Sequence, residues 1–230
     1  ETVACALACH AAGADGLHAH VRDTEQRHVL DVGLYAELLS ELGHRAPDLY
    51  VQITSEAAGR FTPAEQRHLV ETLKPRAVSV ALREITANQD NAVTRRFFAM
   101  CAEAKIDVQH ILYDAADIAH LARLVAQGDV PCDGLKTLIV LGRYTSGQTS
   151  TPTEVAALAQ RLKSALPVPD WAACAFGPQE TACLIETMRH GGKTRIGFEN
   201  NRLNTDGQVA ANNAERVTEL VTQAKRAGFA

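Results

Sequence analysis

Two histidines stand two positions apart, at His18 and His20, and the residues that follow them look like a strand exit. On a strand, residues i and i+2 point to the same face. At a rise of about 3.3 Å per residue they are close enough for two imidazoles to converge on one cation. Borderline metals such as zinc accept imidazole and carboxylate ligands together. The alternative is two histidines on a half-exposed strand, and the spacing alone leaves both open.

A third ligand has to come from another strand end, and Glu199 is the best candidate. It closes the apolar stretch Ile196-Gly197-Phe198, so a carboxylate there could complete a facial His-His-Glu set with an open position for substrate. The alternative role for Glu199 is to cap a helix or loop. His110 falls in the middle of another expected strand, as a core or rim histidine. Six others are expected to be solvated on helices or loops: His10, His28, His44, His68, His120 and His190.

Short β-rich runs alternate with helical patterns along the whole chain. The seven runs are Gly16–Val21, Leu49–Thr54, Ala77–Leu82, Asp107–Tyr113, Leu135–Leu141, Trp171–Phe176 and Thr194–Glu199. Helix starts are marked by Thr-Pro-x-Glu at Thr62 and again at Thr151, each with a cap, a first-turn proline and a glutamate three residues after the cap. Gly13 and Gly43 are expected to end helices.

This alternation predicts a parallel sheet with helices outside it, either open and doubly wound or closed as a barrel. No G-x-G-x-x-G or P-loop motif is present. Helical patterns at both ends, Glu1–Asp15 and Ala210–Gly228, enclose the seven strands. We therefore expect a single (β/α)8 TIM-barrel domain over residues 1–230 whose first strand is missing from the chain. Barrel enzymes carry their sites at the C-terminal rim, where His18 and His20 would lie.

The amino-acid composition argues against nucleic acid or a membrane as a partner of this protein. The chain has 230 residues, 46% of them hydrophobic and 22% charged, with a net charge of −4. Without a basic surplus or a long apolar run, we expect no nucleic-acid partner and no membrane. The first residues, Glu1-Thr2-Val3, do not resemble a secretory signal. Six scattered cysteines are expected to be reduced thiols of a cytoplasmic protein.

Several of these segments together resemble one known family, the β-keto acid cleavage enzymes, whose best-known type is the 3-keto-5-aminohexanoate cleavage enzyme. The resemblance covers nearly the whole chain. The first and the last of the long matching motifs are specific to the family, whereas each motif between them is weak evidence when taken singly. The matching segments are Gly13-Ala14-Asp15-Gly16-Leu17-His18-Ala19-His20-Val21-Arg22-Asp23, Val51-Gln52-Ile53-Thr54-Ser55, Thr62-Pro63-Ala64-Glu65-Gln66, Lys74-Pro75-Arg76-Ala77-Val78-Ser79, Gly191-Gly192-Lys193-Thr194-Arg195-Ile196-Gly197-Phe198-Glu199-Asn200-Asn201 and Asn212-Asn213-Ala214-Glu215.

The resemblance implies a (β/α)8 barrel holding a divalent metal, usually zinc, on His18, His20 and Glu199. It also implies an acyl transfer in which a β-keto acid and acetyl-CoA give acetoacetate and a new CoA thioester, by a Claisen condensation and its reverse. Arg195 matches the family arginine near the base. The region that binds the substrate carboxylate matches Thr54, Ser55 and Ser79. A homo-oligomer, a tetramer or a dimer, is implied as well.

The chain departs from the family pattern where that pattern has acid–base groups. Asn200 stands where the family has a proton-abstracting aspartate, and Gln109 where it has a catalytic glutamate. Neutral amides cannot act as bases at pH 7. Glu56-Ala57 replaces the family's Gly-Gly, which adds a negative charge near the expected substrate. The missing first strand would also have supplied a carboxylate.

Three functional hypotheses follow. The first is a metal-dependent acyltransferase of this family with changed acid–base residues. The second is a metal-binding barrel without turnover that binds a small carboxylate or a CoA ester. The third is a metal-dependent amidohydrolase, which also carries H-x-H on an early strand but needs later histidines and a final aspartate. Here only His110 is a plausible later histidine, and Glu199 and Asn200 stand where that aspartate would be.

Overall fold

A computed structural model describes residues 1–167 and 170–229. Its internal contacts divide the chain into two compact units. One unit comprises residues 15–112 and 119–136 and is called here the N-terminal unit. The other comprises residues 1–14, 113–118 and the described residues of 137–229, and is called the C-terminal unit.

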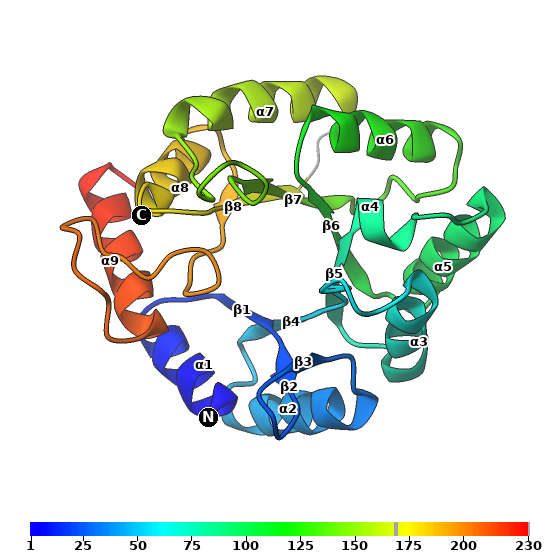
Figure 1. Ribbon diagram of the computed structural model, residues 1–230, viewed down its shortest axis with the longest axis horizontal. Helices are drawn as coiled ribbons and strands as arrows, with labels where there is room; N and C mark the ends of the chain where they lie inside the picture. The colour runs from blue at the N-terminus through cyan, green and yellow to red at the C-terminus, as the bar shows by residue number, and fades with distance from the viewer. Residues whose placement is uncertain (168–169, 230) are drawn as a thin grey trace. The chain divides into compact units, whose positions relative to one another are not determined.

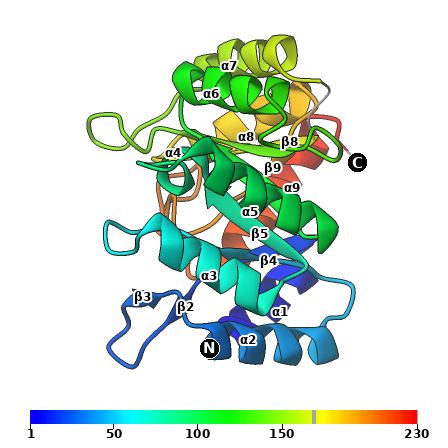
Figure 2. The same cartoon turned by 90° about the vertical axis from the view of Figure 1, so that its right-hand side faces the viewer.

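The N-terminal unit carries a parallel sheet in the order β1-β4-β5-β6 and a small antiparallel pair, β2-β3. The register pairs His18 with Gln52 across β1 and β4, and Ser79 with Gln109 across β5 and β6. Helices α3 and α5 lie side by side against these strands (Figures 1 and 2). The elements are β1 (Gly16–Ala19), β2 (Val21–Arg22), β3 (His28–Val29), α2 (Val32–Arg45), β4 (Tyr50–Thr54), α3 (Pro63–Leu73), β5 (Ala77–Ala81), α4 (Leu82–Ile85), α5 (Asn91–Glu103), β6 (Asp107–Leu112) and most of α6 (Ala115–Ala126).

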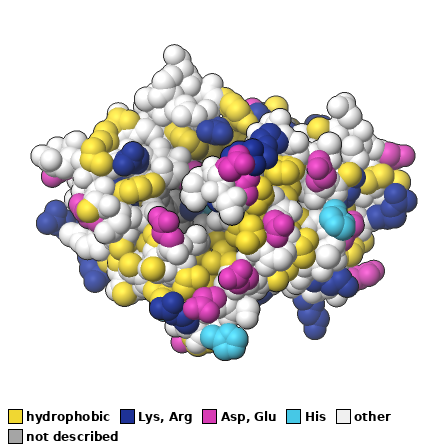
Figure 3. All heavy atoms as spheres, turned by 60° about the horizontal axis from the view of Figure 1, so that its bottom comes forward, with side chains coloured by type: hydrophobic (Ala, Val, Ile, Leu, Met, Phe, Trp, Pro, Cys, Tyr) yellow, Lys and Arg dark blue, Asp and Glu magenta, His cyan; other side chains and the backbone are white. Residues whose placement is uncertain are grey.

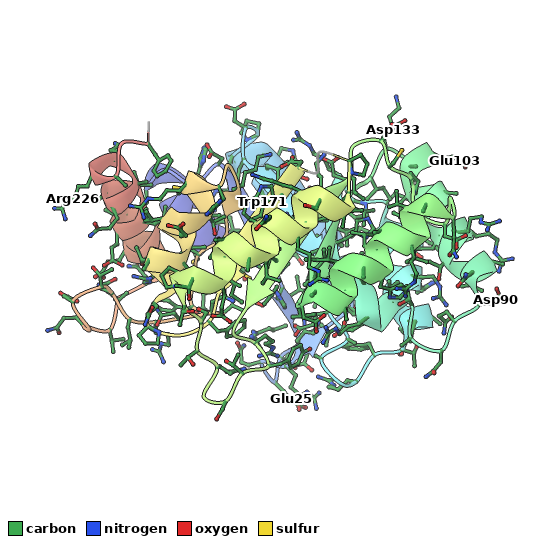
Figure 4. The ribbon with its side chains drawn as sticks, turned by 90° about the horizontal axis from the view of Figure 1, so that it is seen from above. Glu25, Asp90, Glu103, Asp133, Trp171 and Arg226 are labelled. Atoms are coloured by element: carbon green, nitrogen blue, oxygen red, sulfur yellow. The ribbon has the colours of Figure 1, made fainter. Side chains whose placement is uncertain are left out.

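Local sequence signals explain where the helices of this unit begin. Thr62 and Glu65 form the predicted capping box at the start of α3: the Thr62 Oγ1 accepts from the Glu65 amide, and the Glu65 carboxylate accepts from the Thr62 amide. Asp31 caps α2 and Asp90 caps α5, and in each case the carboxylate accepts from one backbone amide of the first turn. Asp90 and Glu103 mark the two ends of α5 in Figure 4. Strand β5 is buried at all five positions, as a parallel strand covered on both faces should be.

The C-terminal unit carries the strands β7-β8-β9 in that order. Helix α1 packs on α9, and α8 packs on both α7 and α9. A cluster of Leu184, Ile185, Leu220 and Ala224 joins α8 to α9. The elements are α1 (Thr2–Ala11), β7 (Lys136–Leu141, all but its first residue), α7 (Pro152–Ala165), β8 (Asp170–Ala175), α8 (Glu180–Arg189), β9 (Lys193–Thr194) and α9 (Asn213–Arg226).

Trp171, the single tryptophan, is buried on β8 beneath α7 (Figure 4). The Lys163 ammonium lies over its ring, 5.9 Å from the centroid. Gly192 makes room for the indole, since a Cβ at that position would stand 2.6 Å from the Trp171 ring. A glycine is therefore required just before β9 by close packing.

Three expectations about elements were wrong. The last strand covers only Lys193–Thr194, and the residues up to Glu199 leave it. Their amides bond to side chains of other elements instead: Gly197 donates to Glu180 and Phe198 donates to Asn213. Gly43 lies inside α2, which continues to Arg45. The predicted first strand is interrupted at His20, and its last residue, Val21, belongs to the β2-β3 pair.

No helix in the described ranges is both long enough and apolar enough to cross a membrane. On the face shown in Figure 3, Lys and Arg side chains are interspersed with Asp and Glu side chains among apolar ones. That mixture agrees with the small net charge of the chain.

Candidate metal centre

His18 and His20 point their ring nitrogens at one another. The Nε2 atoms lie 3.1 Å apart, and the rings meet edge to face with their centroids 5.1 Å apart. Two nitrogens that bind one tetrahedral zinc ion at its usual bond length lie about 3.3 Å apart. The spacing of the two Nε2 atoms therefore suits two ligands of one metal ion.

The opposite nitrogen of each ring faces an oxygen. His18 Nδ1 lies 2.9 Å from Gln52 Oε1, and His20 Nδ1 lies 3.7 Å from a carboxylate oxygen of Glu56. Gln52 Oε1 lies within hydrogen-bond distance and can only accept, so a neutral His18 ring carries its proton on Nδ1 and its lone pair on Nε2. That lone pair faces Nε2 of His20, where either a proton on His20 or a metal ion between the two atoms can interact with it. Metal-binding histidines commonly show this arrangement of an Nδ1 proton and an outer acceptor.

A chain of amides continues from His18 across the sheet of the N-terminal unit. Gln52 donates through Nε2 to Gln109 Oε1 at 3.3 Å. Gln109 is in register with Ser79, whose Oγ is buried and has no hydrogen-bond partner among the described residues. The structure thus connects Gln109 with the histidine pair, and leaves the Ser79 hydroxyl available to a ligand. The sequence did not identify Gln52 as a site residue, because its place opposite His18 follows from the strand register in the fold.

The other two predicted substrate-binding residues already use their hydroxyls. Thr54 Oγ1 accepts from the Glu56 amide, and Ser55 Oγ donates to the Ser79 carbonyl at 2.9 Å. Both residues are buried. Their hydroxyl groups therefore shape the end of β4, and Ser79 is the one of the three that keeps an unpartnered hydroxyl.

His28 lies against the histidine pair, which corrects the expectation that it is solvated. It forms part of β3 and is only 9% exposed, with its ring 5.0 Å from that of His20. The β2-β3 pair turns it inward, where Phe61 meets it edge to face. Nothing in the local sequence around His28 indicates this, because the burial depends on a hairpin and on a loop more than 30 positions away.

His110 agrees with the expectation of a core histidine. It is 3% exposed in β6 and packs on the ring of Phe98. Burial lowers its pKa to about 4, because the apolar surroundings disfavour the charged ring. A neutral, buried imidazole of this kind contributes to packing.

Glu199 belongs to the C-terminal unit and lies in a turn. The amides of Asn200 and Asn201 donate to the Gly197 carbonyl at 2.9 and 3.2 Å, which closes the turn around Glu199. Its carboxylate is 43% exposed and lies 3.7 Å from Arg195 Nη2. The sequence predicted a strand end at this point, whereas the carboxylate is presented by a loop.

Arg195 has unused hydrogen-bonding capacity. Its side chain is 17% exposed, and Nη2 contacts the sulfur of the buried Cys174 at 3.6 Å. The Nε and Nη1 atoms are buried and have no hydrogen-bond partner in the described part of the chain, and the same holds for Nδ2 of Asn200. Buried donors without acceptors are rare, so these N–H groups are candidates to bind an acceptor of a ligand. A planar guanidinium with two unpaired N–H groups suits a carboxylate.

A buried ion pair supports the Glu199 turn and was missed by sequence reasoning. Arg216 on α9 and Glu180 on α8 are both fully buried, with Nη2 and Oε2 2.9 Å apart. Glu180 also accepts from the Gly197 amide, and Arg216 also bonds to Glu219. Burial raises the pKa of Glu180 to about 7, while Arg216 acts in the opposite direction. The pair therefore links α8, α9 and the first residue of the turn.

Comparison with known proteins identifies relatives over nearly the whole chain. A 3-keto-5-aminohexanoate cleavage enzyme from Fusobacterium nucleatum is 23% identical over 229 residues, which cover 97% of this chain and 81% of the relative. A protein of the same name from Acetoanaerobium sticklandii is 24% identical over 235 residues, which cover 99% of this chain and 84% of the relative.

Solved structures with a similar backbone confirm the predicted class of fold. A 3-dehydroquinate dehydratase from Aquifex aeolicus gives a TM-score of 0.61 at 13% identity, covering 96% of this chain and 91% of the other. A triosephosphate isomerase from Bartonella henselae gives 0.54 at 11% identity, covering 96% and 93%. These likenesses show an α/β fold of the TIM-barrel type. The sequence matches the β-keto acid cleavage enzyme family over residues 1–230. The chain therefore belongs to the β-keto acid cleavage enzyme family.

Proposed function

We propose that the protein is a metal-dependent acyltransferase that converts a β-keto acid and acetyl-CoA to acetoacetate and a new CoA thioester. The observation that carries the proposal is the histidine pair, His18 and His20, with Nε2 atoms 3.1 Å apart and an acceptor facing each Nδ1. The His18 Nε2 lone pair is directed at His20 Nε2, and the spacing of these two atoms suits two ligands of one divalent metal ion. The family membership of the chain supports the reaction.

The proposed ligands are His18, His20 and Glu199, with zinc as the expected ion and another divalent metal as the alternative. Two imidazoles and a carboxylate are a donor set that zinc accepts. When bound, such an ion acts as a Lewis acid that polarises a carbonyl oxygen. Gln52 Oε1 orients His18 by accepting a hydrogen bond from its Nδ1–H group, and Glu56 faces Nδ1 of His20.

Arg195 is the proposed anchor for the substrate carboxylate. Its Nε and Nη1 donors and the Nδ2 donor of Asn200 are buried without partners among the described residues. A carboxylate has enough acceptor sites for several such donors. In the N-terminal unit, Ser79 offers an unpartnered hydroxyl for a second polar contact. The amides Gln109 and Asn200 can orient a substrate but cannot remove its proton.

The test measures metal content and product in parallel. Purified protein is assayed for bound zinc and incubated with acetyl-CoA and a panel of β-keto acids, and acetoacetate is measured. We expect zinc on the His18 and His20 ligands, so that His18→Ala binds about one equivalent less than wild type, and we expect acetoacetate with at least one acid. His190→Ala, which removes a half-exposed histidine paired with Glu186, is the matched control and should change neither result. Zinc content that is unchanged in His18→Ala would contradict the proposed ligands.

A second candidate function is a barrel that binds metal and a small carboxylate or CoA ester without turnover. The amides at Asn200 and Gln109 favour it, because general bases are absent from these two positions. Calorimetry distinguishes the two functions. Heat of binding for acetoacetate or acetyl-CoA, with no product from any β-keto acid at millimolar concentration, would favour the binding protein.

A further inference from the structure

A second group of potential metal ligands lies beside the histidine pair and entirely within the N-terminal unit. It consists of His20, His28 and Glu56, which come from three segments of the chain. One donor atom from each lies within 4.8 Å of the other two.

His28 is the observation that points to a ligand. Its Nε2 lies 3.1 Å from the Glu56 carbonyl oxygen, which can only accept, so the ring proton is on Nε2. The lone pair of a neutral ring is then on Nδ1. That atom is buried and has no hydrogen-bond partner among the described residues. A buried acceptor without a donor is rare in proteins and calls for an explanation.

The surroundings hold the His28 ring in place. Phe61 packs edge to face on the ring, with centroids 5.9 Å apart, and His20 lies on another side at 5.0 Å. Arg60 donates to the His28 carbonyl at 3.1 Å and so fixes the backbone of β3. Metal ligands whose orientation is set in advance by such contacts bind more tightly than mobile ones.

Charge also favours a cation at this place. The Glu56 carboxylate lies 3.7 Å from His20 Nδ1, on the side of the His20 ring that faces away from His18. The Glu56 side chain is 31% exposed, so ions can reach it from solvent. The Ala57 amide donates to Glu84 at 2.9 Å, which fixes the backbone next to Glu56. A carboxylate oxygen and one nitrogen of each ring thus lie within 4.8 Å of one another.

We propose that His20 Nδ1, His28 Nδ1 and the Glu56 carboxylate form a second divalent-cation site that takes an imidazole-binding metal such as zinc. It shares His20 with the site of the proposed function, so that His20 bridges two ions when both are bound. The bridge forms when Nδ1 of His20 loses its proton to solvent as the second metal–nitrogen bond is made. Binding at His28 and Glu56 does not require the first ion, so each proposal can fail without the other.

The test is zinc stoichiometry. Protein stripped with a chelator is dialysed against zinc at concentrations far above saturation, and bound metal is measured per chain. Wild type should bind two equivalents. His28→Gln and Glu56→Gln should each bind one, and His18→Ala should also bind one. Glu56→Gln is the safer variant, because it changes one half-exposed carboxylate to an isosteric amide, whereas His28 is buried. Far-UV circular dichroism and Trp171 fluorescence check that every variant is folded.

The matched controls are His190→Gln and Glu186→Gln. These residues form a histidine–carboxylate pair on α8 and just after it, 3.1 Å apart and half-exposed, and neither belongs to a three-ligand group among the described residues. Their substitution should leave two equivalents. Wild type that binds one equivalent, retained in full by His28→Gln and Glu56→Gln, would overturn the second site. One equivalent that is lost in those two variants and retained in His18→Ala would support the second site and contradict the ligands of the proposed function.

Discussion

The side chain of Gln52 lies between His18 and Gln109, accepting from one and donating to the other. Its Oε1 is 2.9 Å from His18 Nδ1, and its Nε2 is 3.3 Å from Gln109 Oε1. The amide therefore orients the histidine and connects it with Gln109. One uncharged side chain thus links a proposed metal ligand to a second amide of the same sheet.

Gln52→Leu should weaken zinc binding about 10- to 100-fold, without lowering the stoichiometry at saturation, because His18 loses the acceptor that fixes its tautomer. Competition against a chromogenic chelator measures this. Gln66→Leu is the matched control: this amide is also buried in the N-terminal unit, yet it has no hydrogen-bond partner among the described residues. Equal zinc affinity in wild type and Gln52→Leu would show that Gln52 has no role at the metal.

Asn200→Asp and Gln109→Glu, singly and together, should raise the rate of acetoacetate formation by 100-fold or more, on the order of what a positioned general base contributes. Glutamate at 109 can still accept from Gln52, so the existing contact is kept. The rate is measured at saturating acetyl-CoA.

Asn201→Asp is the control for Asn200→Asp. The Asn201 side chain is the neighbouring amide in the same turn, and its Nδ2 already donates to the Leu203 carbonyl at 2.8 Å. That variant should lose a hydrogen bond and gain no activity. A comparable gain at both positions would mean that added negative charge, and not a base at Asn200, accounts for the effect.

Arg216→Met should lower the free energy of unfolding by about 3–5 kcal/mol, because it leaves the buried Glu180 without its partner. The double variant Arg216→Met/Glu180→Leu should recover part of that loss, since no charge is then buried alone. Urea denaturation followed by Trp171 fluorescence measures both. Arg189→Met removes an ion pair to Glu186 of similar length, 3.0 Å, in which the arginine is 60% exposed. Because water screens that pair, its loss should cost less than about 1 kcal/mol.

His110 should make stability depend on pH between about 4 and 6.5. Its pKa is lowered to about 4 in the folded chain, from 6.5, so the unfolded state binds more protons within this window. The free energy of unfolding therefore rises with pH across this window, by up to about 1.4 kcal/mol per pH unit. The contribution of His110 to that free energy is lost as the pH falls toward 4. His110→Leu should remove this slope, whereas substitution of the exposed His68 should preserve it. Parallel pH profiles for wild type and His110→Leu would show that His110 is not buried in its neutral form.

The alternation of strands and helices, the helix starts and the histidine pair could all be predicted from the amino-acid sequence. These depend on neighbours close in the chain: the capping box at Thr62 needs only residues 62–65, and the spacing of His18 and His20 alone places their rings near one another. The family membership also follows from motifs that are contiguous in sequence.

The partners that surround those residues come from segments far apart in the chain, and the fold was needed to identify them. Gln52 faces His18 because of strand register, His28 is buried because the β2-β3 pair turns it toward Phe61, and Arg216 is paired with a glutamate 36 positions away. Glu199 lies in a turn because Glu180 and Asn213 satisfy the amides that a longer β9 would have used. Hydrogen bonds and charges across such distances depend on how the chain packs, and no local pattern of residue types specifies them.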